Sequence, residues 1–438
     1  MTLKDVEREL FARWPETQLQ PSTERIRALM DLLGGPQHGY PVIHVTGTNG
    51  KTSTARMIDA LLRARDLRVG RFTSPHLETI RERISVDGEP LDAEGFVGAY
   101  EDVRPYVEMV DASHEVPMSY FEVLTGMAYA AFAETPVDVA VVEVGMGGSW
   151  DATNVADGAV AVVTPIAIDH TRYLGNTVEQ IAGEKAGIIK AGSTAVLAHQ
   201  QVPVAEILLR RAAEVGSVVA REGLEFGVTG RDLAVGGQQL SLRGLRASYD
   251  QVFLPLFGAH QAGNAACALA AVEAFTGGEQ ELDPDIVRAG FADVRSPGRL
   301  ERIRTSPAIL VDATHNPAGM AATAEALAES FTFTRLVGVV AMMADKDVRG
   351  MLEALEPVLA EIVVTRNSSP RSMGVDELAG LAEEIFGPDR VHAAARLDDA
   401  VDQAVAAAEE LGELAGAGVL VTGSVVTAGD ARWLLARG

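Results

Sequence analysis

The sequence predicts an α/β protein with two domains, and three observations support this class. Short apolar runs alternate with amphipathic helical segments over residues 1–215, which is typical of a mostly parallel sheet covered by helices. Residues 295–298, Arg-Ser-Pro-Gly, have the composition of a linker. Strand-like runs resume after this linker. We therefore predict a first domain over residues 1–295 and a second, Rossmann-like α/β domain over residues 299–438.

The elements follow in chain order. Residues 1–8 predict a charged helix rather than a signal peptide. Residues 217–257 carry short alternating runs with glycine turns, which predict a small antiparallel patch, and an alanine-rich helix follows over residues 260–275. The other expected strands are residues 42–46, 69–72, 138–144, 159–164 and 194–198 in the first domain, and 309–312, 336–340, 361–365 and 418–422 in the second.

A glycine-rich turn separates the first expected strand from the first long helix of this sheet. Residues 46–53 read Thr-Gly-Thr-Asn-Gly-Lys-Thr-Ser, and apolar residues at helical spacing follow: Ala55, Ile58, Leu61 and Leu62. Strand, glycine turn and helix place backbone N–H groups and a helix N-terminus around an anion. The lysine can reach outer phosphates, and a hydroxyl of Thr52 or Ser53 can meet Mg²⁺. The sequence therefore predicts a P-loop, in a shorter variant because Val45 stands where the full pattern has glycine.

Composition limits the choice of partners. The net charge of −24 argues against nucleic acid, which requires a positive face. The apolar runs are too short to cross a membrane. The single cysteine, Cys267, cannot form an internal disulfide, so we expect a cytoplasmic protein. Because no exposed apolar patch can be identified from the sequence, we also expect a monomer.

Polar side chains follow several expected strands of the first domain. Glu143 ends an apolar run, Ser74 follows residues 69–72, and His170 follows residues 159–164. Because doubly wound sheets bind ligands at the carboxyl ends of their strands, we expect these three residues to meet there. A buried carboxylate is costly unless it is paired or binds a metal. The three residues therefore predict a hard-cation site that leaves positions open for phosphate oxygens.

Several motifs stand out along the chain, at residues 47–51, 73–77, 81–84, 120–122, 143–148, 151–154, 169–170, 183–187, 260–264, 297–299 and 312–317. Together they resemble the ATP-dependent amide ligases that include the muramyl ligases, and most closely the folylpolyglutamate synthase/dihydrofolate synthase branch. Only about 45 residues precede the P-loop, too few for the nucleotide-sugar domain of muramyl ligases.

This resemblance implies an acyl-phosphate mechanism in which ATP activates a carboxylate and the amine of L-glutamate then attacks it. It implies Mg²⁺, two ions rather than one, bound by Ser74, Glu143 and His170. It also implies catalytic roles for Lys51, Lys185 and His170. The implied ATP-binding residues are Gly47, Thr48, Asn49, Gly50, Lys51, Thr52, Ser53, Asn264, Arg299 and Asp312.

The acceptor implied by the resemblance is dihydropteroate or a folate. A pterin needs an aromatic or apolar slot with a few polar groups, although each residue offered for it could equally pack in the core. His315 and Ser424, at expected strand ends of the second domain, are candidates for a glutamate pocket. The candidates for the folate or pteroate are Leu19, Gln20, Pro21, Ser119, Tyr120, Phe121, Glu122 and Trp150.

In this family the lysine that matches Lys185 is carbamylated by CO₂, so we expect a carbamate here. Carbamylation requires a neutral amine, which burial favours. Two residues depart from the folate pattern, since Thr52 stands where many members have glycine and Ser149 where arginine is common. Two alternatives therefore stay open. One is a ligase for another carboxylate acceptor, such as a muramyl peptide, and the other is a nucleotide-gated binding protein.

Overall fold

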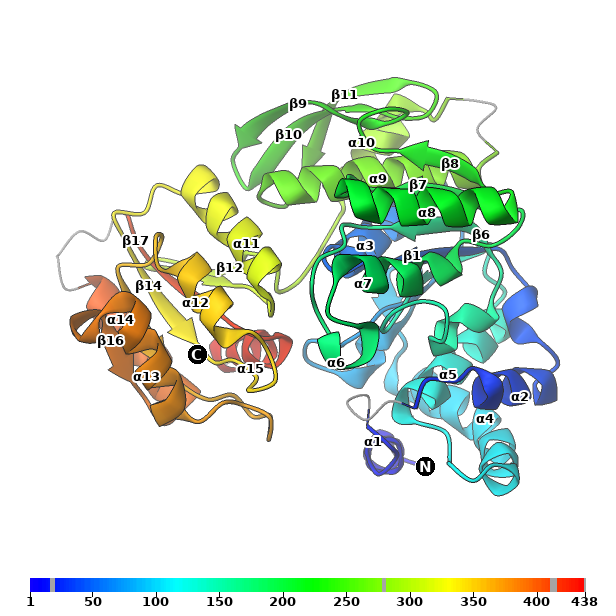
Figure 1. Ribbon diagram of the computed structural model, residues 1–438, viewed down its shortest axis with the longest axis horizontal. Helices are drawn as coiled ribbons and strands as arrows, with labels where there is room; N and C mark the ends of the chain where they lie inside the picture. The colour runs from blue at the N-terminus through cyan, green and yellow to red at the C-terminus, as the bar shows by residue number, and fades with distance from the viewer. Residues whose placement is uncertain (16–19, 278–280, 410–415, 437–438) are drawn as a thin grey trace. The chain divides into compact units, whose positions relative to one another are not determined.

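The computed structural model describes residues 1–15, 20–277, 281–409 and 416–436. It divides into two compact units (Figure 1). Unit 1 comprises residues 1–234, 238–255 and 261–295, and unit 2 comprises residues 235–237, 256–260 and 296–438. Among the described residues, none of the helices has the length and apolar character needed to cross a membrane.

Unit 1 is built on an eight-stranded sheet in the order β4-β3-β2-β5-β1-β6-β7-β8. Strands β2, β5, β1, β6, β7 and β8 pair in parallel, and β3 and β4 add an antiparallel edge. The strands are β1 (Val42–Thr46), β2 (Val69–Phe72), β3 (Ile84–Val86), β4 (Glu89–Pro90), β5 (Val139–Glu143), β6 (Gly158–Val163), β7 (Thr194–Leu197) and β8 (Val218–Arg221).

The expected strands of the first domain are confirmed, with one correction. The antiparallel patch begins at β9 (Gly227–Ala234) and continues with β10 (Gly237–Arg243) and β11 (Ser248–Leu254). We had placed β8 in that patch, which was wrong, because Val218–Arg221 pairs in parallel with β7. The helix α8 (Val202–Val215) joins β7 to β8, and such a crossover connection gives parallel strands.

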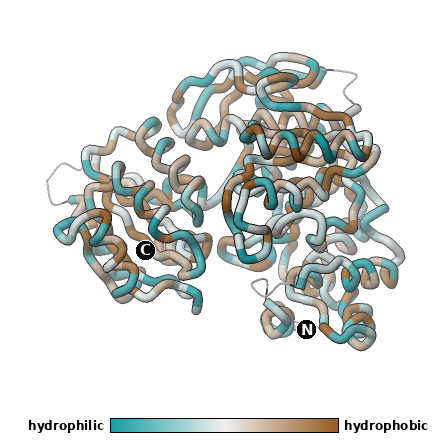
Figure 2. Tube along the Cα trace, in the orientation of Figure 1, coloured by the Kyte–Doolittle hydropathy of each residue, from teal (hydrophilic) through white to brown (hydrophobic). Residues whose placement is uncertain are grey.

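Helices cover both faces of this sheet. Figure 2 shows them alternating between hydrophobic and hydrophilic colour along their length, as expected for surface helices. Helices α1, α2, α4 and α5 share one apolar cluster with Phe72, Ala140 and Val142 of the strands. These helices are α1 (Leu3–Phe11), α2 (Glu24–Leu32), α4 (Ala93–Ser113) and α5 (Tyr120–Glu134). Besides α8, the other helices of unit 1 are α3 (Lys51–Arg63), α6 (Thr171–Leu174), α7 (Val178–Lys185), α9 (Ala259–Phe275) and α10 (Pro284–Ala292). The first two residues of α9 belong to unit 2. The short 3₁₀ turns are η1 (Pro36–His38), η2 (Ile80–Arg83), η3 (Ala152–Val155) and η4 (Ala186–Ile188).

Unit 2 is a second α/β sheet with the strand order β12-β13-β17-β14-β15-β16. The expected strands appear as β13, β17, β14 and β15, all parallel, whereas the sequence missed β12, an antiparallel edge strand, and β16. The strands are β12 (Glu301–Thr305), β13 (Ala308–Val311), β14 (Arg335–Val340), β15 (Glu361–Val364), β16 (Val391–Ala393) and β17 (Ala417–Thr422). The helices are α11 (Pro317–Ser330), α12 (Val348–Leu355), α13 (Val375–Phe386), α14 (Leu397–Glu409) and α15 (Val425–Leu435), with the 3₁₀ turn η5 (Pro388–Arg390).

A buried ion pair fixes α3 on the sheet of unit 1. The Arg71 guanidinium on β2 donates to the Asp59 carboxylate on α3 at 2.7 Å, with both side chains at most 4% exposed. Breaking a buried pair leaves an uncompensated charge, which costs about 3–5 kcal/mol.

We therefore expect Asp59→Ala to lower the free energy of unfolding of unit 1 by about 3–5 kcal/mol, measured by urea denaturation. The matched control is Asp285→Ala, which removes a carboxylate from the exposed pair with Arg288 and should cost no more than about 1 kcal/mol. Equal losses in the two variants would contradict this role for Asp59.

Candidate functional site

The predicted P-loop lies between β1 and α3 and is braced by the segment that follows β6. The backbone N–H groups of Thr48 and Asn49 donate to the Pro165 carbonyl at 3.0 and 3.3 Å. The Thr48 hydroxyl donates to the Ala167 carbonyl at 3.0 Å. The loop therefore has a defined conformation at the carboxyl ends of the neighbouring strands β1 and β6.

Helix α9 supplies a side chain that lies close to this loop. Gly50 has φ +88°, and a Cβ placed on it would lie 2.4 Å from Oδ1 of Asn264. Asn264 donates to Gln261 at 3.1 Å, and Gln261 donates in turn to the Ser53 hydroxyl at 3.4 Å. The structure thus places Asn264 at the P-loop. Gln261 was not among the predicted site residues, although its spacing of three residues from Asn264 puts both on one face of a helix.

Two lysines share one carbonyl oxygen of the loop. Lys51 donates to the carbonyl oxygens of Gly47 and Thr48 at 3.1 and 3.2 Å. Lys185, at the end of α7, is buried and donates to the same Gly47 oxygen at 2.8 Å. Burial first, and then the charge of Lys51, lower the pKa of Lys185 to about 7. A large fraction of Lys185 is therefore a neutral amine at neutral pH.

Glu143 joins three segments at the end of β5. Its carboxylate is buried and accepts hydrogen bonds from the Thr52 hydroxyl at 2.9 Å and from the Ser74 backbone N–H at 3.3 Å. The structure therefore brings together two of the predicted metal ligands, Ser74 and Glu143, with a hydroxyl from the P-loop helix. A carboxylate with neighbouring hydroxyls is a donor set that suits a hard cation such as Mg²⁺.

His170 has a different setting. It precedes α6 in the left-handed conformation, with φ 51°, and its side chain is 38% exposed. Asp169 is a charged neighbour, with Nε2 of His170 to Oδ2 of Asp169 at 3.9 Å. Within the described parts of the chain, no group of three or more His, Cys, Asp or Glu side chains is arranged to hold a metal ion. The metal role of His170 stays a prediction.

The predicted folate residues have identifiable structural contacts. Ser119 and Glu122 form the capping box of α5, and the buried Glu122 carboxylate also accepts from Arg25 at 3.1 and 3.2 Å. Tyr120 stacks on Phe11 with ring centroids 5.5 Å apart, and the Arg83 guanidinium lies 5.2 Å from its ring. These contacts gather aromatic and cationic groups beside α5.

The remaining folate candidates are dispersed. Phe121 packs in the core against Phe72, with ring centroids 5.7 Å apart. Trp150 packs against the apolar cluster of α7, and its backbone N–H donates to Glu184 at 3.2 Å. Gln20 and Pro21 are exposed, and Leu19 lies outside the described residues. The folate roles of these residues stay predictions.

In unit 2, two predicted residues follow β13 and a third lies in the turn before β12. Asp312 is buried, and its carboxylate accepts from the backbone N–H groups of Leu300 and Thr314 at 2.9 and 3.0 Å. His315 lies three residues after it and is bonded through Nδ1 to the Ala313 carbonyl at 3.1 Å. Arg299 lies in the turn before β12 and is partly exposed. The hydrogen bond from the Leu300 N–H to Asp312 therefore ties the turn before β12 to the end of β13.

Ser424 caps α15 after the neighbouring strand β17. Its Oγ accepts from the Thr427 backbone N–H at 3.0 Å and from the side chain of Asn367 at 3.1 Å. Thr427 donates its hydroxyl to the Ala341 carbonyl at 2.7 Å, so the 2.8 Å contact between the two hydroxyls is donated by Ser424. Asn367 could not be predicted from a local pattern, because its partners are 57 and 60 residues away.

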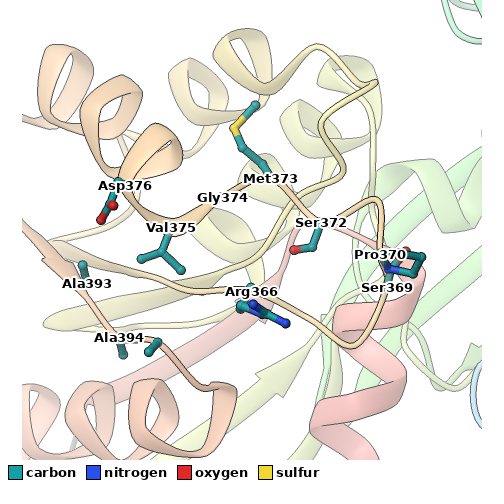
Figure 3. Close-up of a pocket in the computed structure, with 11 residues that line it drawn as sticks. Arg366, Ser369, Pro370, Ser372, Met373, Gly374, Val375, Asp376, Ala393 and Ala394 are labelled. Carbon is teal, nitrogen blue, oxygen red and sulfur yellow. The ribbon is translucent and has the colours of Figure 1, made fainter.

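A depression of about 520 Å³ lies beside this network in unit 2 (Figure 3). Arg366, Ser369, Ser372 and Asp376 supply its polar lining, and Met373, Val375 and Ala394 contribute apolar atoms. It lies where the loop after β15 meets the start of α13 and the end of β16. Neither of the predicted glutamate residues, His315 and Ser424, lines it.

Comparison with known proteins assigns both halves of the chain. Residues 45–272 match the Mur ligase middle domain, and residues 298–425 match the Mur ligase glutamate ligase domain. The chain belongs to the Mur ligase family. It is 52% identical to the dihydrofolate synthase/folylpolyglutamate synthase of Mycobacterium tuberculosis, over 100% of this chain and 94% of that protein. The same enzyme of Bacillus subtilis is 34% identical over 85% of this chain and 86% of its own length.

Solved structures agree with this assignment to the dihydrofolate synthase/folylpolyglutamate synthase group of Mur ligases. The M. tuberculosis folylpolyglutamate synthase complexed with ADP has a TM-score of 0.96 and 53% identity, and the match covers 100% of this chain and 98% of the other. E. coli FolC in complex with DHPP and ADP has a TM-score of 0.88 and 28% identity, covering 100% and 98%. The predicted family and fold class are thus confirmed, and the likeness favours the folate group over a muramyl acceptor.

The contact between Gly50 and Asn264 leads to a test of the P-loop. We expect Gly50→Ala to lower the affinity for ADP at least about tenfold, because the new Cβ would displace Asn264 and strain a left-handed position. Isothermal titration calorimetry measures this change. The control is Gly34→Ala, which has a similar φ of +79° but no atom within 4 Å of the added Cβ. Unchanged ADP affinity in Gly50→Ala would contradict the placement of nucleotide at this loop.

Proposed function

We propose that this chain adds L-glutamate to dihydropteroate and to tetrahydrofolates, with ATP as co-substrate. The observation that carries the proposal is the full-length likeness to enzymes named dihydrofolate synthase/folylpolyglutamate synthase. The P-loop and the Glu143 carboxylate are consistent with it, since they lie at one edge of the sheet and are joined by Thr52.

The chemistry needs two steps. An oxygen of the acceptor carboxylate attacks the γ-phosphorus of ATP, the bond to ADP breaks, and an acyl phosphate forms. The amine of glutamate then attacks the carbonyl carbon, loses a proton, and expels inorganic phosphate. The protein contributes mainly by positioning the reactants and neutralising charge. We assign Lys51 and the loop N–H groups to the β- and γ-phosphates, except those of Thr48 and Asn49, which donate to the Pro165 carbonyl.

Magnesium fits the donor set around Glu143. Thr52 and Ser74 each lie beside this carboxylate, and Mg²⁺ commonly takes only one or two protein ligands and completes its shell with water and phosphate oxygens. When bound, the ion would neutralise charge on the transferring phosphoryl group. We propose Glu143 and Ser74 as ligands, with His170 as a third.

Lys185 suits the carbamate that its family implies. A neutral amine attacks the carbon of CO₂ and releases a proton, so that an ammonium of charge +1 is replaced by a carbamate of charge −1. At present Lys51 and Lys185 both bond Gly47, and the charge of Lys51 lowers the pKa of Lys185. A carbamate on Lys185 would turn this repulsion into attraction. We therefore propose that the working enzyme carries the modified lysine.

The first experiment compares acceptors. ADP release in the presence of ATP and L-glutamate should be stimulated by dihydropteroate and by tetrahydrofolate, but not by a muramyl-peptide precursor. Lys51→Ala should reduce both activities to background, because the loop loses its cation at the phosphates, while circular dichroism stays unchanged. If neither folate acceptor stimulates ADP release by the wild-type protein, the proposed function is overturned. Stimulation by only one would restrict it to a single activity.

A second experiment follows the pH dependence of Lys185. With its pKa lowered to about 7, the amine becomes mostly neutral above that pH, whereas an ordinary lysine does so only above about 10.4. At fixed dissolved CO₂, the carbamate signal in ¹³C NMR should therefore rise most steeply near pH 7. Lys185→Ala should lack the signal and lose turnover, with partial rescue by acetate. A signal that rises only above pH 9, or no signal, would contradict the carbamate.

A further inference from the structure

The guanidinium of Arg56 has no hydrogen-bonding partner among the described residues. Arg56 lies in α3, the helix that begins at the P-loop, and it is partly exposed. Its side chain makes no hydrogen bond or ion pair with any residue that the structure describes. Removing such a group from water without a partner is unfavourable, so an unengaged guanidinium beside a candidate active site calls for a ligand.

The helix places Arg56 between two anchored contacts. Thr52 lies four residues before it and Asp59 three residues after it, and these spacings put all three on one face of α3. Thr52 donates to Glu143 at the end of β5, and Asp59 accepts from Arg71 near the end of β2. The charges of Glu143 and Asp59 both act on the guanidinium, which is consistent with a position near the carboxyl ends of β5 and β2.

Most charged groups around Arg56 bond other groups, although Oδ1 of the nearby Asp59 carboxylate has no hydrogen-bond partner among the described residues. The Glu82 carboxylate accepts the backbone N–H groups of Leu77, Glu78 and Thr79 at 2.8–3.0 Å. Glu143 is bonded by Thr52 and Ser74, and Arg71 is bonded by Asp59. Burial and then Arg71 lower the pKa of Arg56 to about 10, against the opposing charges of Glu82 and Glu143. Arg56 stays cationic at neutral pH and keeps its donors available.

We propose that Arg56 binds the reacting carboxylate of the acceptor, an inference that rests on the proposed function. In-line transfer requires this carboxylate to approach the γ-phosphorus from the side opposite ADP. Under the proposed function, Lys51 and the loop bind the phosphates on the side of ADP, and the Glu143 carboxylate lies beside the phosphoryl group that is transferred. Arg56 follows one helical turn beyond Thr52, and its planar fork matches a carboxylate with two parallel hydrogen bonds.

The test compares binding of the acceptor acid with binding of its amide. The wild-type enzyme should bind dihydropteroate more tightly than the analogue whose carboxylate is a carboxamide. Arg56→Ala should raise the KM for dihydropteroate about 10- to 100-fold and remove the preference for the acid. The KM for ATP should change less than about twofold, since Lys51 and the loop are intact. Arg56→Lys should recover part of the loss, and it also serves if the alanine variant folds poorly.

Arg63→Ala is the matched control. Arg63 lies on the same face of α3, seven residues further on, and its guanidinium is paired with Asp59 and Asp293. This variant should keep the wild-type KM for both substrates. An unchanged acceptor KM in Arg56→Ala, or a rise in the KM for ATP alone, would overturn the inference while leaving the proposed function intact. A wild-type protein that uses neither folate acceptor would overturn both.

Discussion

The buried carboxylate of Glu143 is the constraint on which the site depends. It ends a strand whose other residues, Val139–Val142, are apolar and wholly buried, so an unpaired charge there would be too costly to keep. Two donors make it tolerable: the Thr52 hydroxyl from the P-loop helix and the Ser74 N–H from the turn after β2. Satisfying this one charge fixes the relative positions of three segments that are far apart in sequence.

A second constraint is the Gly47 carbonyl, which receives both Lys51 and Lys185. Two ammonium groups on one oxygen repel each other, and burial raises the cost of charge on the inner one. The geometry is therefore strained electrostatically as long as both are cations, and it is relieved when anionic phosphate reaches Lys51 or when Lys185 loses its charge. The repulsion between the two lysines therefore favours binding of an anionic partner, which is consistent with a site for phosphoryl transfer.

Most of the fold could be predicted because apolar runs in parallel strands carry a strong local signal. The five buried strands β1, β2, β5, β6 and β7 were all expected. Short edge strands such as β4 and β16 were missed, because two or three partly exposed residues carry no periodicity. The P-loop was predictable for the same local reason. Gln261 and Asn367 were not singled out, since their roles depend on partners that only the folded chain brings near.

Polar residues at strand ends are of two kinds, and sequence alone does not separate them. Ser424 illustrates the first kind: its oxygen accepts two hydrogen bonds and its hydrogen is donated to Thr427, so the capacity of a serine hydroxyl is fully used by the fold. A substrate could bond this oxygen only by displacing Asn367 or Thr427.

Arg56 illustrates the second kind, since its donors lie beside Glu143 and bond none of the described residues. Both residues are polar, and both lie near the carboxyl end of a strand. What separates them is the count of hydrogen bonds already made, a quantity that exists only in three dimensions. A residue whose capacity is used up supports the site, whereas a residue with capacity to spare is available to the substrate.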